Sequence, residues 1–187
     1  MSTALAEPEV PESSSLLLTT QRLKLRPVVE SDAEATAVLV TPDVADQLLT
    51  WPSPMSQEEA LVRIKESQEA FEKHEAVDFA ILRTSNERLL GWIGLARGKN
   101  QQARLGYWLG AEFRGAGLMT EAARIVIGPA AKFLGVTGLF AFVRKSNGPS
   151  IGVLDALGFE LNGEEDQFFK FKGTSEFCLR YELDLTD

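Results

Sequence analysis

The chain has 187 residues, of which 44% are hydrophobic and 25% are charged, and this composition is typical of one globular domain. It excludes fibrous, collagen-like and intrinsically disordered proteins, and a chain of this length can fold without disulfides or a structural metal. With one cysteine, Cys178, and one histidine, His74, the sequence has no Cys/His cluster for zinc, so we expect no metal cofactor. A formal net charge of −8 disfavours nucleic acid as a partner and favours a cationic small substrate.

The N-terminal segment differs in composition from the rest of the chain. Residues 1–14 are rich in Pro, Glu and Ser, which predicts a flexible tail, and residues 15–187 then form a single domain. The segment lacks the basic start and continuous apolar stretch of a secretion signal, and no later run approaches the roughly 18 apolar residues of a membrane span. We therefore expect a cytoplasmic protein without a membrane partner.

The first part of the domain predicts one strand and two helices. Residues 16–28 alternate leucine with Arg or Lys, which is the period of a half-exposed strand. Ser31 with Glu34, and Ser56 with Glu59, have the spacing of capping boxes, and each box is expected to open a helix. Three short apolar runs separated by turns then predict an antiparallel meander over residues 77–83, 88–96 and 103–109.

From residue 118 onward the pattern alternates between helix and strand. Apolar residues recur at helical spacing as far as Leu134, and a strand is expected over 138–143. A short helix over 149–157 and two strands over 159–163 and 176–185 complete the chain. The whole pattern predicts a mixed α/β fold of about seven strands and about four helices.

The turn before the helix at residue 118 has the composition of an anion-binding site. It holds Arg114, Gly115 and Gly117 directly before the first helical amides, which lack intrahelical partners and lie at the positive end of the helix dipole. Arg114 can add a charge-assisted hydrogen bond. Two glycines in a tight connection without any ligand explain the pattern equally well. The turn is not a dinucleotide fingerprint, because Thr120 stands where a third glycine is required.

Five motifs occur in a characteristic order over residues 16–185. They are R-L-x-L-R-P at 22–27, Trp51-Pro52, G-Y-W-L-G at 106–110, R-G-A-G-L-M-T-E-A at 114–122, and N-x-x-S-x-x-V-L-x-x-L-G-F at 147–159. Together they resemble the GNAT acetyltransferases, and more narrowly the RimJ/RimL branch. The resemblance implies the GNAT fold, in which a mixed sheet of about seven strands is flanked by about four helices. The fourth and fifth strands of that sheet splay apart, and acetyl-CoA lies between them.

The resemblance also implies which residues bind the cosubstrate. The backbone amides of 114–119 correspond to the loop that binds the pyrophosphate of acetyl-CoA, and Thr120 can add its hydroxyl. Trp108 and Leu109 correspond to residues whose backbone holds the pantetheine arm, Asn147 contacts the cosubstrate, and Ser150 lies near its sulfur. The implied binding residues are Trp108, Leu109, Arg114, Gly115, Ala116, Gly117, Leu118, Met119, Thr120, Asn147 and Ser150.

Ser150 and Tyr107 are the implied catalytic residues. The Ser150 hydroxyl can protonate the leaving thiolate, and a backbone amide between Tyr107 and Leu109 can polarise the thioester carbonyl. A purely structural interpretation is also open, with Asn147 as the cap of a helix and Ser150 in its first turn. The tyrosine that the wider family often has four residues after the serine is replaced here by Leu154.

The base that deprotonates the acceptor amine is the least determined part of the site. Arg104 stands where related sequences usually carry a glutamate, and an arginine cannot accept the proton. Asp78, Glu75 and His74 are alternative bases, although each is also typical of an exposed loop, and a chain of water molecules is a further route. Arg104 can instead meet an acidic group of the substrate or lie on a solvated face.

These expectations together favour an N-acetyltransferase. It transfers the acetyl group of acetyl-CoA to a primary amine, either a protein N-terminal α-amine or a small amine, by direct attack in a ternary complex. Two alternatives stay open: a CoA-binding regulatory or interaction module with little or no turnover, suggested by Arg104 and Leu154, and a phosphate-binding module unrelated to CoA. The expected partner is the amine acceptor, and a homodimer is compatible with the sequence.

Overall fold

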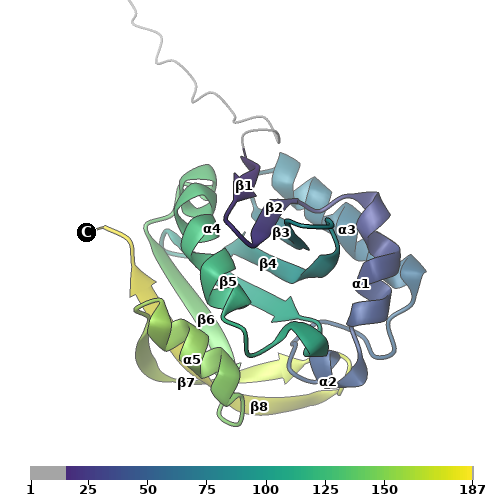
Figure 1. The fold of residues 1–187 in the computed structure, drawn as a ribbon. Coiled ribbons are helices and arrows are strands. Elements are labelled where there is room, and N and C mark those ends of the chain that lie inside the picture. Colours follow the sequence, from purple (N-terminus) through teal and green to yellow (C-terminus); the bar gives the residue numbers. More distant parts are fainter. Residues whose placement is uncertain (1–15, 187) are drawn as a thin grey trace, which may run out of the picture.

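The computed structural model describes residues 16–186, and it contains one eight-stranded mixed sheet with helices on both faces (Figure 1). The flexible tail expected over residues 1–14 lies outside the described residues. The sheet order is β1-β2-β3-β4-β5-β6-β8-β7. The strands are β1 (Leu18–Thr19), β2 (Leu23–Pro27), β3 (Ala76–Arg83), β4 (Leu89–Arg97), β5 (Gln102–Leu109), β6 (Gly138–Arg144), β7 (Glu160–Phe169) and β8 (Thr174–Asp184). The helices are α1 (Ala33–Leu39), α2 (Pro42–Ala45), α3 (Gln57–Glu72), α4 (Leu118–Leu134) and α5 (Gly148–Ala156), with 3₁₀ turns at Glu30–Asp32 and Ala111–Phe113.

The predicted fold class is confirmed, and one strand more than expected results from a turn inside the first predicted strand. The Thr20 amide donates to the Leu23 carbonyl at 2.8 Å, and the Thr20 hydroxyl accepts from the Leu23 amide at 2.9 Å. These local bonds fold the segment 16–28 into the β1–β2 hairpin, because a threonine side chain competes with the strand ladder for backbone groups. The short helix α2, which the sequence did not predict, accounts for the fifth helix.

One of the two predicted capping boxes is present. At the start of α3 the Ser56 hydroxyl accepts from the Glu59 amide at 3.1 Å, and the Glu59 carboxylate accepts from the Ser56 amide at 2.8 Å. The box predicted at Ser31 is wrong, because the carboxylate of the neighbouring Asp32 caps the free backbone amide before α1 instead. It accepts the Val29 amide at 2.9 Å, and α1 begins only afterwards.

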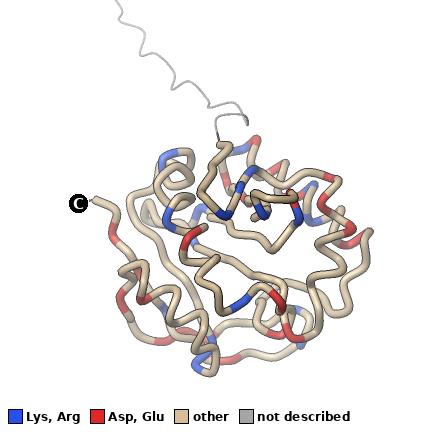
Figure 2. The backbone as a smooth tube through the Cα atoms, in the orientation of Figure 1, with Lys and Arg blue, Asp and Glu red and all other residues tan. Residues whose placement is uncertain are grey.

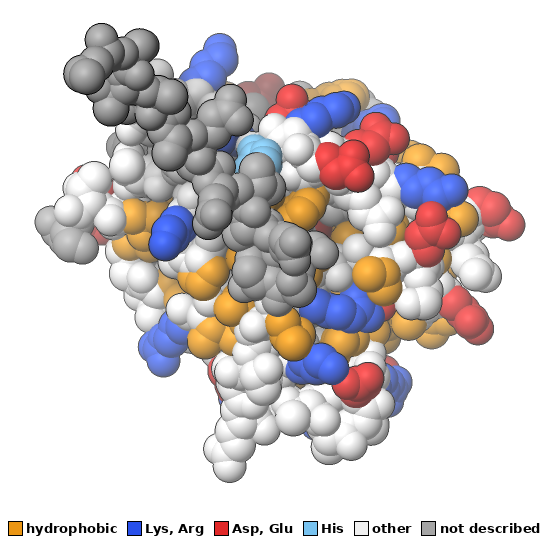
Figure 3. Space-filling model, turned by 90° about the horizontal axis from the view of Figure 1, so that it is seen from above, with side chains coloured by type: hydrophobic (Ala, Val, Ile, Leu, Met, Phe, Trp, Pro, Cys, Tyr) orange, Lys and Arg blue, Asp and Glu red, His pale blue; other side chains and the backbone are white. Residues whose placement is uncertain are grey.

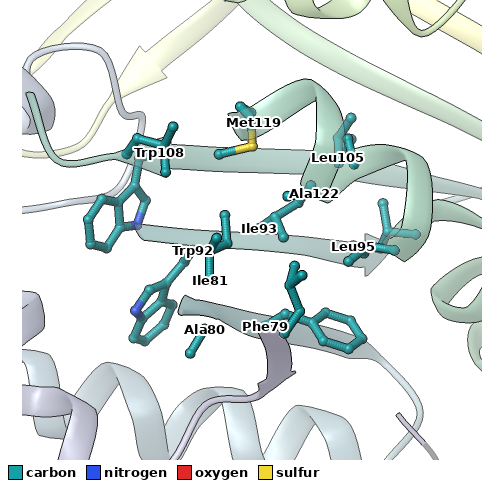
Figure 4. Packing of buried hydrophobic residues seen from close by; sticks show 14 of the residues in the cluster. Phe79, Ala80, Ile81, Trp92, Ile93, Leu95, Leu105, Trp108, Met119 and Ala122 are labelled. Carbon is teal, nitrogen blue, oxygen red and sulfur yellow. The ribbon is translucent and has the colours of Figure 1, made fainter. Parts of the chain in front are cut away.

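Side chains on both faces of the central strands are buried, and the two faces carry different helices. Helix α4 covers one face, while α1 and α3 cover the other (Figure 1). Figure 4 shows Met119 and Ala122 of α4 beside Leu105 of β5, whereas Trp92 and Trp108 project from the opposite face of the same strands. Because successive strand residues point to opposite faces, β5 contributes alternate side chains to two separate environments.

The fourth and fifth predicted strands are β5 and β6 in the structure. They diverge, which confirms the expected splay. They pair in parallel only through Gln102↔Gly138, Ala103↔Leu139 and Arg104↔Phe140. Across the remainder of β5, residues 105–109 of the described chain form no pair with β6. On its other edge β6 pairs with β8 along its whole length, so β6 follows β8 and a gap opens beside β5.

Basic and acidic residues are interspersed along the backbone of the described chain rather than gathered in one region (Figure 2). The face seen in Figure 3 likewise mixes hydrophobic, basic and acidic side chains. Among the helices within residues 16–186, none is long and apolar enough to cross a bilayer. In the same part of the chain, no group of three or more His, Cys, Asp or Glu side chains is arranged to hold a metal.

A buried ion pair holds the entry to α1 against the sheet. Arg26 donates to both carboxylate oxygens of Asp32 at 2.8 Å, and Asp32 is only 5% exposed. We predict that Asp32→Ala lowers the free energy of unfolding by about 2–3 kcal/mol, because it leaves Arg26 without its ion-pair partner and the Val29 amide without its acceptor. Urea denaturation measures this change.

The matched control is the exposed pair between Arg88 and Glu112, whose side chains are 54% and 56% exposed. Glu112→Ala is expected to cost less than about 1 kcal/mol. Equal losses in the two variants would contradict a structural role for the Arg26–Asp32 pair.

Candidate active site

A cavity of about 590 Å³ lies where β5 and β6 diverge. Its lining includes the turn before α4 and the start of α5 on one side of the sheet. On the other side it includes Trp51, Arg63, Asp78 and Trp92. The cavity therefore passes through the gap and connects the two faces of the sheet.

The turn before α4 offers a set of backbone amides without protein partners. Gly115 and Gly117 have φ angles of 79° and 71°, the left-handed region that glycine adopts without strain. Within the described chain, the amides of residues 115–120 donate to no acceptor, and the first bond of this turn runs from the Glu121 amide to the Gly117 carbonyl at 3.1 Å. Free amides at a helix N-terminus favour an anion, so the turn has the geometry that the predicted anion-binding site requires.

The β1–β2 turn fixes this amide cluster in place. Arg22 donates to the Ala116 carbonyl at 3.0 Å and, through Nε, to the Glu121 carboxylate at 2.7 Å. Thr20 donates to the same carboxylate at 2.5 Å. Arg22, paired with Glu121, thus ties the turn to the β1–β2 hairpin. The sequence analysis missed this contribution, although this arginine opens the first quoted motif.

The edge of β5 exposes backbone groups of alternate residues to the gap. Along β5, the backbone amides point alternately toward β4 and toward the gap. Two hydrogen bonds at the ends of the β4–β5 pair show which amides point toward β4: Gly98 N–H to Gln102 C=O (2.8 Å) and Gly110 N–H to Leu90 C=O (2.9 Å). The register between them is regular, so Trp108 directs its amide toward β4. The amides of Tyr107 and Leu109 consequently face the gap, and Trp108 lines the cavity with its indole ring.

Two hydroxyl groups meet on the α4 and α5 side of the gap. The Tyr107 hydroxyl lies 2.8 Å from Ser150 Oγ, where either oxygen can donate, and 3.1 Å from the Ser150 carbonyl oxygen. Burial raises the pKa of Tyr107 to about 12, so the phenol keeps its proton at neutral pH. Asn147 accepts from the Ser150 amide at 3.2 Å, so it is the helix cap of the structural interpretation while also lining the cavity.

Three tryptophans form an aromatic wall on the α1 and α3 side. The ring of Trp51 lies 5.3 Å from that of Trp92 and 5.4 Å from that of Trp108, edge to face in both pairs. The guanidinium of Arg63 lies over Trp51 at 4.4 Å. The three rings form an apolar wall on one side of the cavity.

Asp78 directs its carboxylate over a glycine of the next strand. A Cβ atom at Gly94 would lie 1.9 Å from Asp78 Oδ1, so only glycine leaves room for the carboxylate. Burial raises the pKa of Asp78, while the Ser67 hydroxyl and the charges of Arg63 and Arg104 act in the opposite direction. A carboxylate with this pKa shift is a stronger base than an exposed one.

Of the three predicted alternative bases, Asp78 is the one that lines the cavity. His74 instead stacks on Phe133 with ring centroids 4.6 Å apart, and Glu75 lies exposed in the turn after α3. Arg104, at the position of the family's usual glutamate, is half-buried in the cavity wall.

The comparisons with known proteins agree with this geometry. Residues 22–160 match the family model described as an acetyltransferase (GNAT) domain. The chain belongs to the GNAT family. YjcK of Bacillus subtilis, described as a probable N-acetyltransferase, is 38% identical over 117 residues, which are 61% of this chain and 65% of YjcK. The match therefore spans slightly less than two thirds of that relative.

Solved GNAT structures share the fold at low sequence identity. The ribosomal-protein-S5-alanine acetyltransferase from Vibrio fischeri has a TM-score of 0.80 at 21% identity, over 92% of this chain and 98% of that one. RimL, the ribosomal L7/L12 α-N-protein acetyltransferase solved in complex with coenzyme A, has a TM-score of 0.78 at 20% identity, over 91% and 99%. The resemblance to the RimJ/RimL branch is thus confirmed at the level of the fold.

The cavity gathers nearly all the residues that the sequence assigned to this GNAT site. Ala116 is the exception among the implied binding residues, because its carbonyl is held by Arg22 and its side chain does not line the cavity. The sequence analysis missed Arg63, Trp92 and Gly94. No local motif marks these three residues, because they come together in the cavity only when α3, β4 and β5 pack against one another.

Proposed function

We propose that this GNAT protein transfers the acetyl group of acetyl-CoA to a primary amine by direct attack in a ternary complex. One observation carries the proposal: a single cavity leads from free amides at the start of α4, through the gap beside β5, to a carboxylate on the opposite face. The YjcK relative and the CoA complex of RimL support it. The donor and the acceptor would therefore enter from opposite faces of the sheet.

The donor side supplies both charge and hydrogen bonds. The amides of residues 115–120 and the guanidinium of Arg114 would hold the diphosphate, because a helix N-terminus and a fork of N–H donors both favour anions. The Arg114 Nε already donates to the Leu109 carbonyl at 3.2 Å, which keeps its side chain at the cavity. The amides of Tyr107 and Leu109 would bond the pantetheine arm and polarise the thioester carbonyl.

The reaction requires one proton to leave the amine and one to reach the sulfur. The amine nitrogen attacks the thioester carbon, the new C–N bond forms, and the C–S bond breaks to release the thiolate. Ser150 would protonate that thiolate and take a replacement proton from the Tyr107 hydroxyl, which solvent then reprotonates. Tyr107 on β5 would thus replace the tyrosine that the wider family often has on α5, at the position of Leu154.

The function is tested with the full chain, acetyl-CoA and a panel of α-amines, lysine peptides and polyamines. We expect free thiol to appear together with an acceptor that has gained one acetyl group in its mass spectrum. CoA binding without thiol release from any amine would favour the regulatory-module alternative. Equal thermal stabilisation by CoA and by simple nucleotides would favour a phosphate-binding module.

The amide cluster predicts a specific effect of a side chain at Gly117. In Gly117→Val a β-branched residue must adopt a left-handed backbone and stand among the amides, so we expect CoA affinity to fall at least about tenfold by titration calorimetry. Gly128→Ala is the control, because a Cβ there meets nothing within 4 Å and the site lies on the same helix away from the cavity. Unchanged affinity in Gly117→Val would show that the diphosphate binds elsewhere.

The two hydroxyl groups predict a loss of turnover rather than of binding. We expect Ser150→Ala and Tyr107→Phe each to lower kcat at least about tenfold while the dissociation constant for acetyl-CoA changes less than about twofold. Steady-state kinetics and calorimetry measure the two quantities. Ser175→Ala, an exposed serine on β8, serves as the control. Wild-type kcat in both test variants, across the pH range, removes the hydroxyl pair from the mechanism.

A further inference from the structure

The acceptor half of the cavity contains buried polar atoms that the protein does not satisfy. Trp108 is 5% exposed, and its Nε1 has no hydrogen-bond partner among residues 16–186. Gln47 Oε1 is likewise buried and without a partner in the described structure. Both residues line the cavity. Because buried polar atoms in proteins are nearly always hydrogen-bonded, this donor and this acceptor are available to water or to a polar ligand in the cavity.

The charge of this half of the cavity is opposite to that of the whole chain. Arg63 and Arg104 line it together with Asp78, and in the part of the chain that is described neither arginine forms an ion pair. Arg63 instead donates to the Thr50 carbonyl and covers the ring of Trp51. Two cationic groups thus face one carboxylate inside a protein whose net charge is −8.

The strand register places Arg104 and Asp78 over a common floor. Residues that are paired across strands or two apart along one strand share a face. Three rows therefore lie side by side on the α1 and α3 face: Ala76–Ala96–Arg104, Asp78–Gly94–Gly106 and Ala80–Trp92–Trp108. Between Asp78 on β3 and Arg104 on β5, only glycine and alanine side chains intervene.

The dimensions of this floor define a compact ligand with two charges. The backbones of β3 and β5 are two strand spacings apart, about 10 Å, and both charged side chains reach inward from their strands. Both side chains are close enough that the charge of Arg104 shifts the pKa of Asp78. A lone ammonium would be attracted by Asp78 and repelled by the two arginines, whereas an amine that carries its own anion satisfies all three groups.

We propose that the acceptor is a primary amine with an acidic group close to it, so that Asp78 receives the ammonium while Arg104 and Arg63 bind the anion. The inference rests on the proposed acetyl transfer and names its acceptor class. In the reaction Asp78 accepts the amine proton, the freed nitrogen attacks the thioester carbon, and the departing thiolate takes its proton from Ser150. Asp78 on β3 thus provides the carboxylate that relatives usually carry at the position of Arg104.

The acceptor class is tested by the kcat/KM of matched amines that differ in a single charge. The peptides Ala-Glu-Ala-amide, Ala-Gln-Ala-amide and Ala-Lys-Ala-amide compare acidic, neutral and basic N-termini, and glycine against glycinamide compares an acidic with a neutral small amine. We expect the acidic peptide to be preferred over the basic peptide at least about tenfold, because a tenfold preference corresponds to the free energy of one charge-assisted contact. The peptide and small-molecule arms distinguish the source of the amine.

Charge reversal at Arg104 provides the matched variant. Arg104→Glu is expected to reverse the preference, so that Ala-Lys-Ala-amide becomes the better acceptor. Arg124→Glu changes the net charge equally, but Arg124 is an exposed residue of α4 outside the cavity, and this variant should keep the wild-type preference. Equal preference in wild type and Arg104→Glu, or a wild-type preference for the basic peptide, overturns the proposal while leaving acetyl transfer intact.

The role of Asp78 is tested by Asp78→Asn, with the exposed Asp166→Asn of β7 as the control. We expect the test variant to lose about 100-fold in kcat/KM at neutral pH, with unchanged CoA affinity. The loss should shrink at higher pH, because the amine there loses its proton to solvent. Retention of wild-type kcat/KM across the pH range excludes Asp78 as the base. If no amine releases thiol although CoA binds, the proposed function itself fails.

Discussion

The separation of β5 from β6 is the constraint on which the site depends. The two strands pair only through residues 102–104 of β5, after which β6 stays with β8. A strand in the interior of a sheet normally has its amides and carbonyls hydrogen-bonded to the neighbouring strands on both sides. Here the edge from Tyr107 to Leu109 keeps backbone groups available to a ligand, and the gap beside it gives that ligand a passage through the sheet.

Because successive side chains of a strand point to opposite faces, β5 places different functional groups on the two sides of the sheet. Odd-numbered Tyr107 directs its hydroxyl to Ser150 on the donor side, while even-numbered Arg104 and Trp108 lie on the acceptor side. In the proposed reaction this one strand would contribute the hydroxyl that bonds Ser150, the amide that polarises the carbonyl and the charge that binds the acceptor, all within six residues. A shift of one residue in the β4–β5 register would exchange all these roles, and the buried side chains on both faces prevent it.

Local interactions make the site specific where the sequence alone was ambiguous. The two glycines of the 115–117 turn were compatible with a bare connection, and the free amides beside them favour an anion site. Arg104 was compatible with a solvated face, and the glycine and alanine floor places it opposite Asp78. The net charge of the chain suggested a cationic acceptor, but a bound ligand interacts most strongly with the nearest and least screened charges, and those in its cavity include Arg63, Arg104 and a single carboxylate.

The sequence by itself determined the features that arise from neighbouring residues. The glycine turn before α4, the Ser56 cap and the alternation of the central strands follow from local backbone chemistry and side-chain period. The family was indicated by the order of its motifs along the chain. Only the tertiary structure decided the contacts between distant residues. Tyr107 meets Ser150 across 43 positions, and Asp78 rather than His74 reaches the cavity because β3 pairs with β4 in one register. Such contacts depend on how strands and helices pack together, which no local pattern encodes.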